Sequence, residues 1–354
     1  MLKDFRLFTL VFFSIFTLLF VSCGKEDEIS PILEEGSYEK GVFVTNEGPF
    51  LDGVGTITYY DSDSKTTENN VFQSANMNLE LGNIVQSMAI SGDNGYVLVN
   101  NSNKIHIVEA GTMKLKTSLD ITLPRYMVTN NGLGYISHWS TTGSGSISIV
   151  DLTNNTVRKT INTEGAGPEK MVINDNKLYV VNSGGFGVDS TLAIINLSTE
   201  EVIKKITVGT NPTSIVIDKE SNIWVFGKGF TDWDNPSLNT KGRLVKIVND
   251  EIVLNLEIEN NFQNNMAINP AGDKLYLSTE TTVYEHSIND TIFNSVPLIS
   301  KGFYGLGINP ISGNIYGADA GDFQSLGEVI IYNPQGELLS SFEAGIIPNG
   351  FVFK

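Results

Sequence analysis

The sequence predicts an all-β fold, a seven-bladed β-propeller closed by pairing of the C-terminal strand with the N-terminal blade. A segment of about 44 residues with four expected strands recurs from residue 41 onward, which is typical of propeller blades. After residue 30 no stretch keeps the 3.6-residue period of an amphipathic helix. A partial repeat at 348–354 lacks its outer strands, and residues 41–72 offer the missing ones.

The first residues predict a lipoprotein signal peptide over 1–22. Lys3 and Arg6 precede an apolar run over 7–21, which is short for a membrane-spanning helix. The run ends at Cys23, and small and apolar residues directly before a cysteine resemble the lipobox of bacterial lipoproteins. We expect Cys23 to be the lipidation site and the first residue of the mature chain. A plain signal peptide with an incidental cysteine is the alternative.

A short acidic segment follows the cysteine. Residues 24–28, Gly-Lys-Glu-Asp-Glu, resemble the export tag of Bacteroidetes lipoproteins that reach the outer face of the outer membrane. Residues 23–40 therefore form the expected acylated cysteine and flexible tether, with the propeller over 41–354. The expected location is the outer membrane, lipid-anchored and exposed at the cell surface, with the lipid as the only membrane contact.

The repeat shows most clearly in three positions of each blade. The expected inner strands carry the apolar anchors Met88, Met127, Met171, Ile215, Met266, Leu306 and Phe351. The expected second strands carry the aromatic residues Tyr96, Tyr135, Tyr179, Trp224, Tyr276 and Tyr316. The expected third strands alternate and begin at residues 104, 146, 191, 243, 282 and 328. These recurring residues are predicted to form the core.

The two chain ends together make the seventh blade. Residues 41–48, GVFVTNEG, match a second strand, and residues 56–62, TITYYDS, match a third. The inner strand of this blade is then 348–354, which removes an exposed sheet edge. A β-sandwich or two smaller sheets would not explain a repeat split between both ends.

Composition excludes several functions. The net charge is -17, and no basic stretch follows the first residues, so nucleic-acid binding is not expected. A single cysteine excludes a thiolate metal cluster and three separated histidines leave little for a zinc site, so we expect no metal site. No catalytic serine motif or phosphate loop is present, so we expect no enzyme and no cofactor. A propeller lyase stays the least favoured alternative, since His138 alone lies on the expected ligand face.

Several motifs resemble known propellers. Residues 178–185, LYVVNSGG, and 191–218 look like the YVTN/YncE-type seven-bladed propellers. VTNEGPF at 44–50, the segment 87–108 and LPRYM at 123–127 resemble Bacteroidetes surface lipoproteins of the cobalamin-capturing BtuG-type group. That resemblance implies a corrinoid or other small ligand and a TonB-dependent outer-membrane transporter as partners. A protein- or glycan-binding adhesive propeller is the alternative.

The ligand site is expected where the loops leading into the inner strands and the loops after the second strands meet at one face. The candidate ligand-binding residues are Glu47, Phe50, Gln86, Asn100, Asn101, Arg125, Tyr126, His138, Trp139, Glu169, Phe186, Phe230, Trp233, Asn264, Tyr304 and Asn349. For a corrinoid, the aromatic residues would cover the macrocycle, the asparagines would meet its amides and Arg125 would pair with its phosphate. His138 would contact or coordinate the cobalt.

Each candidate also has a structural interpretation. Arg125 follows a proline and would brace a neighbouring acidic loop. Glu47 would cap a turn, and Trp139 and Phe230 would pack on adjacent loops. The sequence leaves these alternatives open.

Overall fold

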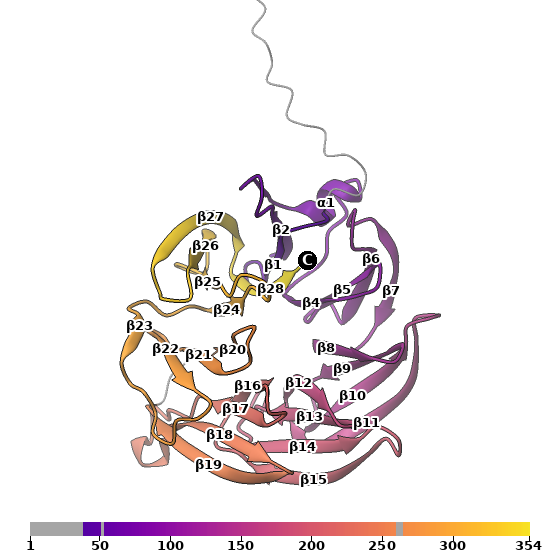
Figure 1. Cartoon of the computed structure of the whole chain (residues 1–354). Helices are drawn as coiled ribbons and strands as arrows, with labels where there is room; N and C mark the ends of the chain where they lie inside the picture. Colours follow the sequence, from indigo (N-terminus) through magenta and orange to yellow (C-terminus); the bar gives the residue numbers. More distant parts are fainter. Residues whose placement is uncertain (1–37, 51–52, 260–264) are drawn as a thin grey trace, which may run out of the picture. The chain divides into compact units, whose positions relative to one another are not determined.

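Seven antiparallel sheets, each of four strands, form a ring about a common axis in the computed structural model (Figure 1). The space along this axis contains two cavities and is called the channel here. The structure describes residues 38–50, 53–259 and 265–354. The predicted seven-bladed β-propeller is confirmed. The signal peptide, Cys23, nearly all of the expected tether and the candidate Asn264 lie outside the described residues.

Each blade is built from the channel outward. The inner strands are β28 (Pro348–Phe353), β4 (Val85–Ser91), β8 (Pro124–Asn130), β12 (Pro168–Asn174), β16 (Pro212–Ile217), β20 (Asn265–Ile268) and β24 (Gly305–Ile308). The second strands are β1 (Val42–Asn46), β5 (Asn94–Val99), β9 (Leu133–His138), β13 (Lys177–Asn182), β17 (Ile223–Gly227), β21 (Lys274–Ser278) and β25 (Ile315–Asp319). The third strands are β2 (Thr56–Tyr60), β6 (Lys104–Glu109), β10 (Ser144–Asp151), β14 (Thr191–Asn196), β18 (Gly242–Val248), β22 (Val283–Ser287) and β26 (Leu326–Tyr332). The outer strands are β3 (Thr67–Glu68), β7 (Leu115–Asp120), β11 (Thr156–Ala166), β15 (Glu201–Thr207), β19 (Glu251–Ile258), β23 (Pro297–Ile299) and β27 (Leu338–Ile346).

The ring closes through the two ends of the propeller. Strand β28 pairs with β1, so that Phe43 faces Val352 and Val44 faces Phe351 in the register. Figure 1 shows the yellow C-terminal strand beside the indigo first strand. The backbone N–H of Lys354 donates to the carbonyl of Gly41 at 2.9 Å. This pairing satisfies backbone groups that would otherwise form an exposed edge.

The repeated anchor positions form the interior. The second-strand aromatic residues are buried, and Trp224 and Tyr276 are among the largest fully buried side chains. Anchors of the inner strands line a cavity of ≈ 240 Å³ in the channel, among them Met88, Met127 and Met171. Methionine is unbranched and flexible, so its side chain suits the irregular space around such a cavity.

Two short helices interrupt the strands, α1 (Val71–Ala75) and the 3₁₀ turn η1 (Pro236–Leu238). The sequence did not predict either of them. Within the described ranges, neither helix has the length or apolar character needed to cross a bilayer.

Candidate functional site

A polar cavity opens at the end of the channel where the inner strands begin. Its volume is ≈ 260 Å³. The loops that follow the second strands emerge at this same end, so both sets of loops border it. Its lining residues are Glu47, Gln86, Arg125, Tyr126, Trp139, Glu169, Lys170, Ser183, Gly185, Gly187, Asn211, Thr213, Lys228, Asn265, Tyr304 and Asn349. We call it the central cavity.

Irregular strand pairing brings these side chains to the axis. In five inner strands the register shifts just after the first residue, as in a β-bulge. A bulge leaves residues unpaired and redirects their side chains. The residues passed over by the pairing are Gln86, Arg125, Tyr126, Glu169, Lys170, Thr213 and Asn349, and all of them line the central cavity.

The residue before each of these strands has a left-handed backbone. The φ angles are 60° at Ile84, 44° at Leu123, 61° at Gly167, 49° at Asn211 and 57° at Ile347. A β-branched residue rarely adopts such a φ, and the conformation costs about 1–3 kcal/mol at non-glycine positions. Four of the five strands then begin with proline, which needs no ladder partner for a backbone N–H. Strain repeated around one cavity indicates that the rest of the fold holds these strand ends in place.

Gly167 shows why one of these positions needs glycine. A Cβ atom there would collide with the backbone of Gly185, which itself borders the central cavity. The close approach lets the β13–β14 loop reach the cavity wall.

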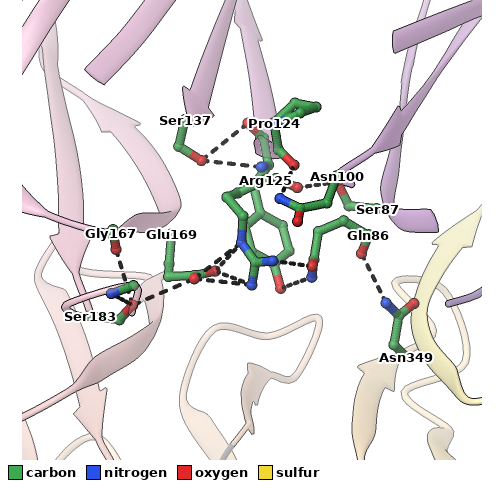
Figure 2. Close-up of polar contacts among 12 residues, drawn as sticks. Gln86, Ser87, Asn100, Pro124, Arg125, Ser137, Gly167, Glu169, Ser183 and Asn349 are labelled. Carbon is green, nitrogen blue, oxygen red and sulfur yellow. Dashed lines mark hydrogen bonds and ion pairs between the residues drawn. The ribbon is translucent and has the colours of Figure 1, made fainter. Parts of the chain in front are cut away.

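A buried ion pair dominates one side of the cavity. Arg125 Nη2 lies 3.0 Å from Glu169 Oε1, and Arg125 Nε donates to both carboxylate oxygens at 3.2 and 3.3 Å. Arg125 Nη1 also donates to Gln86 Oε1 (Figure 2). The guanidinium carbon lies 4.1 Å from the ring centroid of Trp139. Burial is the largest effect on the pKa of Arg125 and lowers it. The charges of Glu169, Tyr126 and Glu47 and the hydrogen bond with Glu169 together outweigh burial and hold this pKa above its ordinary value.

A second polar cluster forms where the first and last strands meet. The Tyr304 hydroxyl donates to the Glu47 carboxylate at 3.1 and 3.2 Å, and Asn349 Nδ2 donates to Glu47 Oε1 at 3.0 Å. Burial raises the pKa of Glu47 above its ordinary value, against the lowering effect of Asn349 and Arg125. The Asn349 amide also donates to the backbone carbonyls of Val85 and Gln86. This cluster therefore ties the closing strand to the next blade.

Exposed aromatic side chains surround the mouth. Phe50, Phe186, Trp233 and Phe323 retain 68%, 76%, 75% and 41% of their exposure, and each lies on a loop after a second strand. Phe186 packs edge-on against Trp139 with 5.3 Å between ring centroids. Phe323 packs in the same way against Tyr304 at 5.4 Å. These two pairs connect the rim to the lining of the central cavity.

The structure brings half of the predicted residues into the central cavity. They are Glu47, Gln86, Arg125, Tyr126, Trp139, Glu169, Tyr304 and Asn349. Whether any of them contacts a ligand stays a prediction. The Arg125 guanidinium pairs with Glu169 of β12, and contact between Arg125 and a phosphate stays a prediction.

The other predicted residues that the structure describes are not part of the lining. Asn100 is buried and donates its amide to the Pro124 carbonyl at 3.1 Å, so it holds the start of β8. Asn101 donates to Asn83 Oδ1 at 2.8 Å. His138 lies 3.1 Å from the Ser148 hydroxyl, and burial lowers its pKa. Phe230 is bridged through its backbone to Thr240.

Sequence reasoning missed Lys170, Asn211, Lys228 and Asn265. One signal was available for Lys170. Residues 168–171 read Pro-Glu-Lys-Met, and residues 124–127 read Pro-Arg-Tyr-Met, with the same spacing to the anchor methionine. Because Tyr126 was predicted as a site residue, the same offset would have identified Lys170.

No metal centre is apparent in the part of the chain that the structure describes, where no group of three or more His, Cys, Asp or Glu side chains is placed to hold an ion.

The fold and the cavity define a seven-bladed propeller with a polar site at one end of its channel. The chain belongs to the family described as "Domain of unknown function (DUF5074)", whose model matches residues 40–353. No curated protein matches the chain.

Several solved structures share the fold. A quinonprotein alcohol dehydrogenase-like protein (BT1487) from Bacteroides thetaiotaomicron is 18% identical, with a TM-score of 0.65 over 89% of this chain and 78% of that one. Hydrazine synthase from Kuenenia stuttgartiensis is 14% identical, with a TM-score of 0.57 over 74% and 87%. Apo AztD from Citrobacter koseri is 11% identical, with a TM-score of 0.54 over 88% and 96%. At these identities the similarity shows the fold alone.

Proposed function

We propose that this protein captures a small ligand at the cell surface, that the ligand is a corrinoid such as cobalamin, and that the protein passes it to a TonB-dependent transporter. The lipid anchor at Cys23 and the acidic tag after it would place the propeller on the outer membrane. The motifs of the first third of the chain support a Bacteroidetes setting.

The observation that carries the proposal is the ring of exposed aromatic side chains around a polar cavity. Phe50, Phe186, Trp233 and Phe323 are the exposed aromatic side chains among the large exposed hydrophobic residues described, and all lie at the cavity end. Exposed apolar groups gathered at one place mark a binding surface, whereas scattered ones do not. A corrinoid offers a flat apolar macrocycle edged with amides, which suits such a rim.

The volume of the central cavity limits how much of a corrinoid could enter it. A cavity of ≈ 260 Å³ lies just below the usual range of about 300–1,000 Å³ for small-molecule pockets. A corrinoid would therefore lie across the mouth and insert only one edge or side group. Hydrogen bonds to the Glu47 carboxylate hold the side chains of Tyr304 and Asn349 in place, so little ordering would accompany binding.

Titration with cyanocobalamin and hydroxocobalamin tests the proposal by calorimetry and absorbance. We expect binding at a 1:1 ratio. Phe186→Ala or Trp139→Ala should weaken it by about 1–3 kcal/mol, because each change removes aromatic contact area. Ile311→Ala is the matched control, since Ile311 is 90% exposed on a β24–β25 loop at the opposite end.

Two outcomes would count against corrinoid capture. Absence of both heat and spectral change with either cobalamin at micromolar protein would rule it out. Retention of glycans or proteins without cobalamin binding would support the adhesive alternative.

A further inference from the structure

The charged groups of the central cavity do not balance. Its lining carries three basic residues, Arg125, Lys170 and Lys228, and two acidic ones, Glu47 and Glu169. Arg125 and Glu169 neutralise each other through their ion pair. The charges of the two lysines and of Glu47 are not part of that ion pair.

Glu47 does not neutralise the lysines. The single hydroxyl proton of Tyr304 is shared between both oxygens of the Glu47 carboxylate, and Asn349 Nδ2 donates to Oε1. Both partners belong to the closing side of the ring. Burial also raises the pKa of Glu47, which favours its neutral form.

Lys170 extends across the channel from the bulge of β12. Its Nζ donates to Asn265 Oδ1 on β20 at 3.2 Å and lies 5.7 Å from the ring centroid of Tyr126 on β8. Within the described residues no carboxylate oxygen lies within 4.0 Å of this ammonium. An ammonium has three N–H donors, so two remain available to a ligand.

Lys228 follows β17 on the same cavity wall. Its backbone N–H donates to the Asn211 carbonyl at 3.2 Å, which fixes the position of its Cα. No hydrogen bond or ion pair involves its side chain in the ranges 38–50, 53–259 and 265–354. The central cavity therefore presents two uncompensated cations in a protein whose net charge is -17.

We infer that the central cavity binds an oxyanion, a carboxylate or phosphate group, between Lys170 and Lys228. An oxyanion would accept the free N–H donors of both ammonium groups and would lower the energy of a buried cation. For the corrinoid of the proposed function, this group is the nucleotide phosphate, and in that respect the inference rests on that proposal. A carboxylate or phosphate group on a different solute would accept the same hydrogen bonds from the two lysines.

The protonation of Lys170 supports this assignment. Burial lowers the pKa of Lys170 to about 8, and the charge of Glu169 offsets only part of that effect. A bound anion favours the protonated amine, so binding should become weaker as the pH rises past about 8. The other titratable groups that line the cavity are Glu47, Arg125, Tyr126, Glu169, Lys228 and Tyr304.

Calorimetric titration with inorganic phosphate tests the site without a corrinoid. We expect one phosphate to bind per chain, and Lys170→Met or Lys228→Met to weaken binding about 10- to 100-fold through loss of a charged hydrogen bond. Lys116→Met is the matched control, because the Lys116 ammonium also donates to an asparagine, Asn94, at 2.8 Å but lies on the outer strand β7. Equal affinity in wild type and Lys170→Met, or no binding at millimolar phosphate, overturns the inference.

Measuring anion affinity over a range of pH distinguishes a Lys170 that binds the anion from a Lys170 that only packs in the fold. Sulfate is the suitable probe, because its charge does not change near neutral pH. Its affinity should fall between about pH 7 and 9 in the wild-type protein and should be weak and constant in Lys170→Met. The same pH dependence in both proteins would contradict the role of Lys170. The melting temperature should not fall in Lys170→Met, since the change removes a buried charge.

Two corrinoids separate this inference from the proposed function. Cobalamin carries the nucleotide phosphate, and dicyanocobinamide lacks it. Lys170→Met should weaken cobalamin binding and leave cobinamide binding unchanged. Equal loss or no loss for both ligands would overturn the phosphate assignment while corrinoid capture stood. Phosphate binding without cobalamin binding would refute corrinoid capture and leave the anion site in place.

Discussion

The buried ion pair between Arg125 and Glu169 permits a quantitative test of how the central cavity is held. The two side chains retain 14% and 6% of their exposure, and the nitrogen–oxygen distance is 3.0 Å. Arg125→Met would keep an unbranched apolar side chain but would remove the guanidinium, and with it the charge and the contact with Trp139. Glu169 would then be left as a buried carboxylate without its cation.

The expected loss of stability is large. Breaking a buried ion pair by removing one partner costs about 3–5 kcal/mol, since the remaining charge keeps its desolvation penalty. For roughly 300 ordered residues with about 2.1 cal/mol/K of unfolding entropy each, that loss lowers the melting temperature by about 5–8 °C. Calorimetry or circular dichroism during heating would measure it.

A double variant identifies the cause. Arg125→Met together with Glu169→Met removes both charges, and replacing a buried pair by apolar residues is often neutral or stabilising. We expect the double variant to melt above Arg125→Met alone. The control is Lys104→Met, which breaks the exposed pair with Asp120 at 2.9 Å and should cost less than about 1 kcal/mol. Additive losses in the double variant would refute the ion-pair explanation.

Three further predictions concern other parts of the chain. Deleting 348–354 should abolish the cooperative melting transition, because it removes the inner strand of one blade and exposes sheet edges; unchanged melting would contradict ring closure. The ring nitrogens of His286 have no hydrogen-bond partner among the described residues, and burial lowers the pKa of this side chain. In mild acid the unfolded chain therefore binds more protons at this histidine than the folded chain does. Stability should therefore fall as the pH drops below about 6.5, and His286→Phe should lessen that fall; identical pH profiles would argue against it. Cys23→Ala should release the protein from the membrane, and membrane association that survives a high-salt wash would count against lipidation.

The fold was predictable because each blade repeats the same information. Met127, Met171 and Ile215 follow one another at intervals of 44 residues, and each is followed by a buried aromatic residue. A weak signal in one repeat therefore does not change the predicted fold, because the other repeats carry the same pattern. The short helix α1 was not predictable, since five residues give no periodicity and their apolar members also suit a strand.

The central cavity was only partly predictable, because its geometry departs from regular strand alternation. Simple alternation places Arg125 and Met127 on one side of β8 and Tyr126 on the other. The register shift between Pro124 and Met127 instead turns both Arg125 and Tyr126 toward the channel. Since β12 has the same irregularity, Lys170 lies in the cavity although alternation alone would direct it elsewhere.

Other differences between the predicted site and the structure concern polar side chains that make hydrogen bonds within the propeller. Asn100 looks like a ligand-binding amide in sequence, yet its amide satisfies the carbonyl of Pro124. Asn265 similarly donates to the Tyr304 carbonyl at 2.7 Å and accepts from Lys170, so it is both brace and cavity lining. Sequence alone cannot tell which buried carbonyl will need a donor, because that depends on neighbouring blades.

The charge distribution narrows what the central cavity would retain. A protein with a net charge of -17 repels anions at long range, so the two lysines of the cavity act only after a ligand has arrived. A small inorganic anion would gain their hydrogen bonds alone and should bind weakly. A larger ligand that carries an oxyanion on an apolar body would also gain contact with rim residues such as Phe186 and Trp233. The combination therefore favours a ligand with both features, and the ratio of cobalamin affinity to phosphate affinity measures how much the aromatic rim contributes.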